Sequence, residues 1–210
     1  MKDDSKLSLI GKPALILLII TVIAGGLLGY VSAITEEPIA KITAQKKEES
    51  MKAVFPDAKE FGEEKEINDE VVETPGCDIV TVTPALDDKG EDMGYAVSVS
   101  TKGFSAGLEL MFGIDTEGKI TGLSVVNCSN ETPGLGANSG NTSYTVNGEP
   151  WYEQFEGKDE RSATLTKDDA KNGEIEAITG ATITSRAVSN ASKESIKYIA
   201  EKYTKGGDKK

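Results

Sequence analysis

The sequence predicts an α+β protein in which an N-terminal transmembrane helix is followed by a domain of mainly antiparallel sheet with flanking helices. The first observation behind this fold class is an uncharged apolar stretch over residues 13–34. The second is a run of short segments rich in β-branched residues between residues 79 and 126, and the third is a helical apolar pattern over residues 185–203. The 210 residues suffice for a membrane anchor and one domain of ordinary size.

Residues 13–34 are expected to cross a membrane, because about 20 apolar helical residues span a bilayer core of roughly 30 Å. A cleaved signal peptide is the alternative, since Val31-Ser32-Ala33 is an acceptable small-residue cleavage site. The apolar stretch is, however, longer than the about 7–15 residues typical of a signal peptide. We therefore expect an uncleaved single-pass anchor.

Lysine residues precede the apolar stretch within residues 1–12, and Glu36 and Glu37 follow it. This bias predicts a cytoplasmic N-terminus and an extracytoplasmic domain, so the protein is expected in the plasma (inner) membrane. Residues 35–56 are expected to continue as a helical stalk that Pro56 ends, because the residue before proline avoids the helical region.

The extracytoplasmic domain is expected over residues 57–205, beginning with an acidic loop or short helix at 57–76. Four strands are predicted at residues 79–83, 95–100, 108–114 and 120–126, and the short connections between them imply antiparallel hairpins. The residues after them are predicted to form a loop at 130–150, a short helix at 151–155, a longer helix at 185–203 and a frayed tail at 206–210.

The composition excludes several kinds of site. The chain has no histidine, which excludes a Ser-His-Asp hydrolase and a His-based zinc site. Cys77 and Cys128 are too few for a four-thiolate iron–sulfur cluster, and they are either one disulfide or two buried thiols. The net charge of −12 argues against nucleic acid as a partner. No metal site is expected.

The segment Thr179-Gly180-Ala181-Thr182 precedes the C-terminal helical pattern. Helix N-termini bind phosphate, and the two small residues leave room for a bulky group to approach Thr182. A helix cap without further function is the alternative, because Ser and Thr are common at helix N-caps.

A second motif, Glu131-Thr132-Pro133-Gly134-Leu135-Gly136, follows the last predicted strand. Pro-Gly favours a turn and the second glycine permits close approach of backbone, so this segment is either a platform for a flat ligand or an ordinary loop. The segment Gly103-Phe104-Ser105-Ala106-Gly107 is similarly ambiguous, and we expect Phe104 in the core rather than as a stacking platform.

The order of these features resembles that in the FMN-binding G subunit of the Rnf electron-transport complex, and more distantly that in the C subunit of the sodium-translocating NADH:quinone reductase. The features are the N-terminal span, G-F-x-x-G, the strand pair between Ile114 and Val126, E-T-P-G-L-G, Trp151 with Phe155, T-G-A-T and a terminal helix. The resemblance covers nearly the whole chain, and its modest length favours the Rnf protein.

The resemblance implies covalent FMN, attached by a flavin transferase through a phosphoester to Thr182. Thr179, Gly180 and Ala181 would frame the phosphate. Glu176 stands where this family usually has Asp for recognition by the transferase. The residues implied to contact the isoalloxazine ring are Glu131, Thr132, Gly134, Leu135 and Gly136.

The resemblance further implies a membrane-anchored electron carrier among the membrane subunits of an ion-translocating ferredoxin:NAD⁺ oxidoreductase. The carrier itself would have no catalytic residue, because flavin supplies one- and two-electron transfer. Two alternatives are the C subunit of the quinone reductase and a non-redox surface binding module in which T-G-A-T is only a helix cap.

Overall fold

The computed structural model describes residues 4–67 and 77–204. The chain forms two compact units, Met1–Lys46 and Lys47–Lys210. The second unit therefore begins ten residues before the boundary expected at residue 57. The expected tail at 206–210 and residues 68–76 of the acidic segment lie outside the described residues. Residues 57–67 are described, and they contain two short strands rather than the expected loop or short helix.

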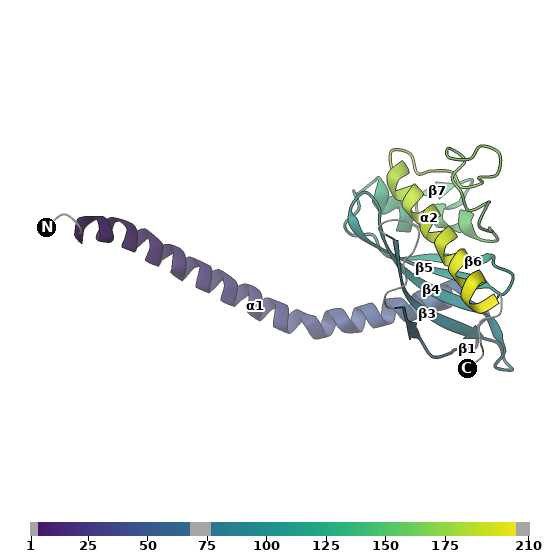
Figure 1. The fold of residues 1–210 in the computed structure, drawn as a ribbon, viewed down its shortest axis with the longest axis horizontal. Coiled ribbons are helices and arrows are strands. Elements are labelled where there is room, and N and C mark those ends of the chain that lie inside the picture. Colours follow the sequence, from purple (N-terminus) through teal and green to yellow (C-terminus); the bar gives the residue numbers. More distant parts are fainter. Residues whose placement is uncertain (1–3, 68–76, 205–210) are drawn as a thin grey trace. The chain divides into compact units, whose positions relative to one another are not determined.

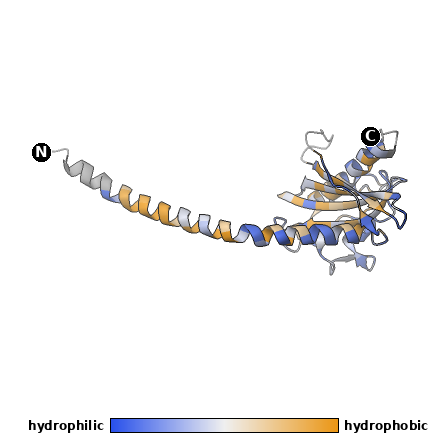
Figure 2. Cartoon of the chain, turned by 90° about the horizontal axis from the view of Figure 1, so that it is seen from below, coloured by the Kyte–Doolittle hydropathy of each residue, from blue (hydrophilic) through white to orange (hydrophobic). Residues whose placement is uncertain are grey.

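Helix α1 (Asp4–Val54) provides the first unit and continues into the second. Its apolar stretch is followed by a hydrophilic stretch (Figure 2). Within the described part of the chain, α1 is the one helix that is long and apolar enough to cross a membrane, a test that a signal sequence also passes. The helix ends at Val54, directly before the Phe55-Pro56 pair that was expected to stop it.

The second unit is built on an antiparallel sheet with the strand order β1-β3-β4-β5-β6, in which β2 also pairs with β3. The four predicted strands are confirmed as β3 to β6 (Figure 1). The strands are β1 (Glu60–Phe61), β2 (Lys65–Glu66), β3 (Cys77–Leu86), β4 (Asp92–Lys102), β5 (Ala106–Asp115) and β6 (Ile120–Asn127).

Each face of this sheet buries a separate apolar cluster, because side chains alternate between the two faces along a strand. On one face, Val97 and Phe112 belong to the main core, which also contains residues of the C-terminal helix. On the opposite face, Ala96 and Met111 pack with Val54 at the end of α1. The sheet is therefore covered on both faces, and the predicted α+β class is confirmed.

The C-terminal helix α2 (Thr182–Ile199) lies across the main core face of the sheet (Figure 1). It begins three residues earlier than predicted and continues as a π-helix, Ala200–Thr204. The predicted short helix at Trp151–Phe155 is confirmed as a 3₁₀ helix with Trp151 buried. The predicted loop at 130–150 contains a 3₁₀ helix, Gly136–Gly140, and a hairpin of β7 (Thr145–Val146) and β8 (Glu149–Pro150).

Both cysteines are free thiols, so the disulfide alternative is not formed in this structure. Cys77 is buried at the start of β3, and burial raises the pKa of its thiol to about 12. A thiol with so high a pKa stays protonated at neutral pH and is a poor nucleophile.

Candidate functional site

The two sequence motifs meet at one pocket beside the N-terminal end of α2. Its volume of about 290 Å³ lies at the lower end of the range of roughly 300–1,000 Å³ seen for small-molecule sites. Of the predicted site residues, Thr179 and Gly134 lie outside the lining. The lining residues are Phe104, Glu131, Thr132, Leu135, Gly136, Gly180, Ala181, Thr182, Ile183 and Thr184.

The hydroxyl groups around T-G-A-T differ in burial and in hydrogen bonding. Thr184 is buried and its Oγ1 donates to Glu131 Oε2 at 2.6 Å. Ser185 is also buried, and its Oγ donates to the Ala181 carbonyl oxygen at 3.0 Å. Thr182 is half-buried and lines the pocket, whereas Thr179 is exposed and does not. Of the two threonines of T-G-A-T, Thr182 is therefore the one that lines the pocket.

Thr182 is the first residue of α2, and Ala181 occupies the N-cap position. No side-chain hydrogen bond caps this helix. Thr182 is therefore not the N-cap residue of α2, and the alternative in which it serves only as a helix cap is wrong. The first backbone N–H groups of a helix have no partner within it, so they can bind a phosphate group at this position.

Glu131 lies beneath the pocket and is only 3% exposed. Its Oε1 accepts a hydrogen bond from the Ser105 backbone N–H at 3.0 Å, and its Oε2 accepts the bond from Thr184. Gly103 and Gly136 make room for this carboxylate, because a Cβ atom on either would collide with a Glu131 oxygen. Gly136, the last glycine of E-T-P-G-L-G, thus permits the close approach of Glu131, the first residue of the same motif.

The two motif loops also touch directly. Gly180 has a φ of +77°, and a Cβ atom there would lie 2.9 Å from Leu135 Cδ2. Glycine at this position therefore serves both the left-handed backbone and the contact between the loops.

An apolar rim surrounds the pocket, formed by Phe104, Leu135 and Ile183, which are 64%, 40% and 53% exposed. The expectation that Phe104 belongs to the core is wrong, because the turn between β4 and β5 carries its ring outward to the pocket. Exposed aromatic and branched side chains around a pocket suit a flat ring system, so the rim fits the ring of FMN. The unpaired backbone N–H groups at the start of α2 fit its phosphate.

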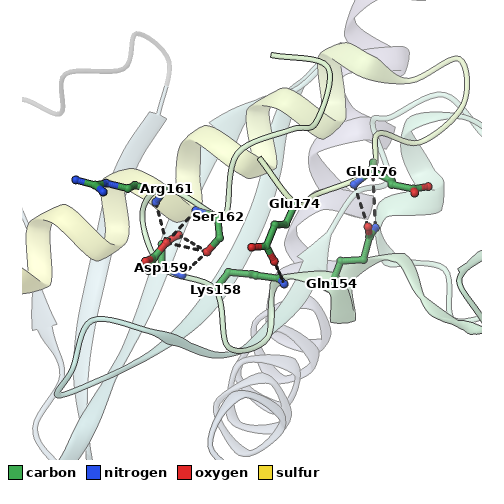
Figure 3. Close-up of polar contacts among 7 residues, drawn as sticks. All are labelled: Gln154, Lys158, Asp159, Arg161, Ser162, Glu174 and Glu176. Carbon is green, nitrogen blue, oxygen red and sulfur yellow. Dashed lines mark hydrogen bonds and ion pairs between the residues drawn. The ribbon is translucent and has the colours of Figure 1, made fainter. Parts of the chain in front are cut away.

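The segment that leads to T-G-A-T is anchored through its backbone (Figure 3). Gln154 Oε1 accepts the Glu176 backbone N–H at 2.9 Å, and Trp151 Nε1 donates to the Glu176 carbonyl oxygen at 2.6 Å. Lys158 adds a contact to Glu174 at 2.5 Å. The Glu176 side chain is directed away from Gln154 and is exposed. Its carboxylate is thus accessible to solvent while its backbone is held.

Comparison with known proteins adds to this geometry. Residues 103–197 match the FMN-binding domain family, a segment that contains both motifs and most of α2. The G subunit of the Na⁺-translocating ferredoxin:NAD⁺ oxidoreductase complex of Acetobacterium woodii is 32% identical over 196 residues, which cover 88% of this chain and 89% of that protein. The chain belongs to the G-subunit family of ion-translocating oxidoreductase complexes.

Two further relatives belong to the same family. The G subunit of the ion-translocating oxidoreductase complex of Methanosarcina acetivorans is 29% identical over 201 residues, covering 95% of this chain and 98% of that protein. The G subunit of the proton-translocating ferredoxin:NAD⁺ oxidoreductase complex of Clostridium ljungdahlii is 36% identical over 107 residues, covering 51% of this chain and 54% of that protein. The chain therefore matches about half the length of the Clostridium relative and nearly all of the other two.

Proposed function

We propose that this member of the G-subunit family relays electrons through FMN bound covalently to Thr182, within a membrane complex that oxidises reduced ferredoxin, reduces NAD⁺ and translocates an ion. One observation carries the proposal: the two motifs, far apart in sequence, line one pocket, and Thr182 is among its lining residues. The name of the Acetobacterium woodii relative supports the assembly and its reaction. The name of the Methanosarcina acetivorans relative supports ion translocation by an oxidoreductase complex.

The choice of Thr182 rests on the state of its neighbours. Thr184 and Ser185 use their hydroxyls in buried hydrogen bonds, and Thr179 lies outside the pocket. A phosphoester at Thr182 would place the phosphate at the N-terminus of α2, where unpaired backbone N–H groups and the helix dipole favour negative charge. Gly180 and Ala181 would frame it, whereas Thr179 lies outside the lining and would not contact it.

FMN supplies the one- and two-electron chemistry when bound. The residues of this chain would bind and orient it: the rim of Phe104, Leu135 and Ile183 against the ring, and Thr132 and Gly136 along the loop. Gly134 is not proposed to contact the ligand, because it lies outside the pocket lining. Its φ of +76° instead fits a role in the turn.

The apolar stretch of α1 supports a membrane anchor. The lysines that precede it support a cytoplasmic N-terminus and a domain outside. Carbonate washing should leave the chain in the membrane fraction. Release of a shortened soluble form would instead identify residues 1–33 as a cleaved signal.

Covalent flavin is tested by co-expressing the full chain with a flavin transferase and viewing a denaturing gel under ultraviolet light. The wild type should fluoresce, and Thr182→Val should not. Thr179→Val is the matched control, because it removes a hydroxyl from the same loop outside the pocket, and it should fluoresce as the wild type does. A dark wild-type band would refute covalent flavin, and a fluorescent Thr182→Val band would refute the site.

A further inference from the structure

Glu131 is a buried carboxylate whose position needs a reason. It is 3% exposed, and burying a carboxylate is unfavourable unless hydrogen-bond donors satisfy it. Its two donors, Ser105 and Thr184, lie 26 and 53 residues away in the sequence. Glu131 therefore joins three segments that no local structure would hold together.

These three segments are the ones that form the pocket. Ser105 belongs to the turn that carries Phe104, Glu131 begins the E-T-P-G-L-G loop, and Thr184 lies in the first turn of α2, two residues after Thr182. The glycines at 103 and 136 admit the carboxylate where a Cβ atom would exclude it. The position of the carboxylate thus sets the relative positions of the rim, the loop and the proposed attachment residue.

The charge of Glu131 matters as well, because among the described residues that line the pocket it is the one ionisable side chain. Two-electron reduction of FMN with uptake of one proton adds one negative charge to the ring. A negative charge held nearby in a medium of low dielectric constant opposes that addition.

We propose that Glu131 is a positioning residue of the flavin site, which fixes the Phe104 turn, the E-T-P-G-L-G loop and the start of α2 relative to one another and lowers the reduction potential of the flavin. This inference rests on the proposed function for its electrochemical part. Its positioning part concerns the protein without flavin and stands separately.

The electrochemical part is tested by titrating the flavinylated full chain in detergent at an electrode, which supplies the electrons. Glu131→Gln keeps the size of the side chain and an acceptor for Ser105 but removes the charge, so the midpoint potential should shift to a more positive value. Thr184→Val keeps the charge and removes a donor that partly neutralises it, so the potential should shift to a more negative value.

Glu91→Gln is the matched control, because Glu91 lies in the exposed turn at the other end of β4. Its potential should equal that of the wild type. Shifts of the same sign in Glu131→Gln and Thr184→Val, or no shift in Glu131→Gln, would overturn the electrostatic role.

The positioning part is tested by amide hydrogen exchange on the full chain expressed without the transferase. Glu131→Ala should make the Ser105 amide exchange about tenfold faster, since its hydrogen bond to a charged group is lost. The Ser185 amide, which bonds to the Ala181 carbonyl oxygen in the first turn of α2, should also exchange faster, because Thr184 Oγ1 loses the partner that holds this turn in place. Glu131→Gln should restore most of the protection at Ser105. Unchanged exchange in Glu131→Ala would overturn the positioning role.

The two arms separate the failure of this inference from the failure of the proposed function. A wild-type chain without covalent flavin would contradict the proposed function, and the exchange measurement would still decide the positioning role. A flavinylated wild type with an unaltered potential in Glu131→Gln would contradict only the inference.

Discussion

At the scale of single residues, the two glycines of E-T-P-G-L-G are present for different physical reasons. Gly136 faces buried polar atoms, because a Cβ atom there would collide with Glu131 Oε2 and lie 2.6 Å from Thr184 Oγ1. Gly134 has open space around its Cβ position but a φ of +76°. Replacing Gly136 should therefore disturb the hydrogen bond between Thr184 and Glu131, whereas replacing Gly134 should strain only the backbone.

We expect Gly136→Ala to lower the free energy of unfolding by roughly 3–5 kcal/mol, since it adds overpacking to the loss of a buried hydrogen bond. Gly134→Ala should cost only roughly 1–2 kcal/mol, the penalty of a left-handed backbone. Urea unfolding followed by the fluorescence of Trp151, the one tryptophan of the chain, measures both. Equal costs for the two substitutions would contradict the close contact at Gly136.

The sequence predicted most of the residues that line the pocket, but not which of them are buried and which are exposed. Thr182 and the E-T-P-G-L-G loop were recognisable because their residue types and order are distinctive. The burial of Glu131 and the exposure of Phe104 were not predictable, because both depend on contacts between distant segments. The glycines that make room for the Glu131 carboxylate, Gly103 and Gly136, lie in two separate motifs, so no local pattern in the sequence indicates that this side chain is buried.

At the scale of elements, α2 is tied to the preceding loop by an ion pair on its exposed side. Arg186 donates to both carboxylate oxygens of Asp168, each at 2.7 Å. These hydrogen bonds, together with the charges of Arg186 and Lys193, hold the pKa of Asp168 below its ordinary value. The Asp168 side chain is 31% exposed and the Arg186 side chain 46%, so solvent screens much of the interaction between them.

A folded-state pKa that is lower than the unfolded-state pKa stabilises the fold above about pH 4, and this stability is lost as the pH falls through the folded-state pKa. Asp168→Asn should therefore cost up to about 1 kcal/mol at pH 7 and less at pH 2. Urea unfolding at the two pH values measures the difference, with the exposed turn substitution Asp88→Asn as the control. A cost that persists at low pH would show that the pair acts through packing rather than charge.

The sequence predicted the elements of the domain well, because the four long strands are rich in β-branched residues and short turns separate them. The start of α2 was predicted three residues late, since T-I-T resembles a turn or strand when read locally. The helix includes these residues because Thr184 finds its partner in Glu131 rather than within the helix.

At the scale of the whole molecule, the end of α1 is part of the folded domain. Val54 and Phe55 are buried in the second apolar cluster, and Thr121 Oγ1 donates to the Val54 carbonyl oxygen at 2.6 Å. Ser124 Oγ also donates to Ser50 Oγ at 3.0 Å. The stalk expected from the sequence thus contributes its last turns to the core of the domain.

We expect a fragment of residues 47–210 to be soluble and to unfold cooperatively. A fragment of residues 57–210 should be less stable by roughly 3–6 kcal/mol, because it lacks the burial of one valine and one phenylalanine side chain. Thermal unfolding followed by circular dichroism compares the two. Equal melting temperatures would place the boundary of the domain at residue 57 after all.

The proposed electron relay depends on where the flavin is attached. Trypsin cleaves after Lys171 and Arg186, so one peptide, residues 172–186, contains Thr179, Thr182, Thr184 and Ser185. The most direct measurement is fragmentation mass spectrometry of this peptide from full-length chain co-expressed with a flavin transferase. We predict that it carries the mass of FMN less one water, assigned to Thr182. An unmodified peptide, or a modification assigned to any other residue, would contradict the central claim.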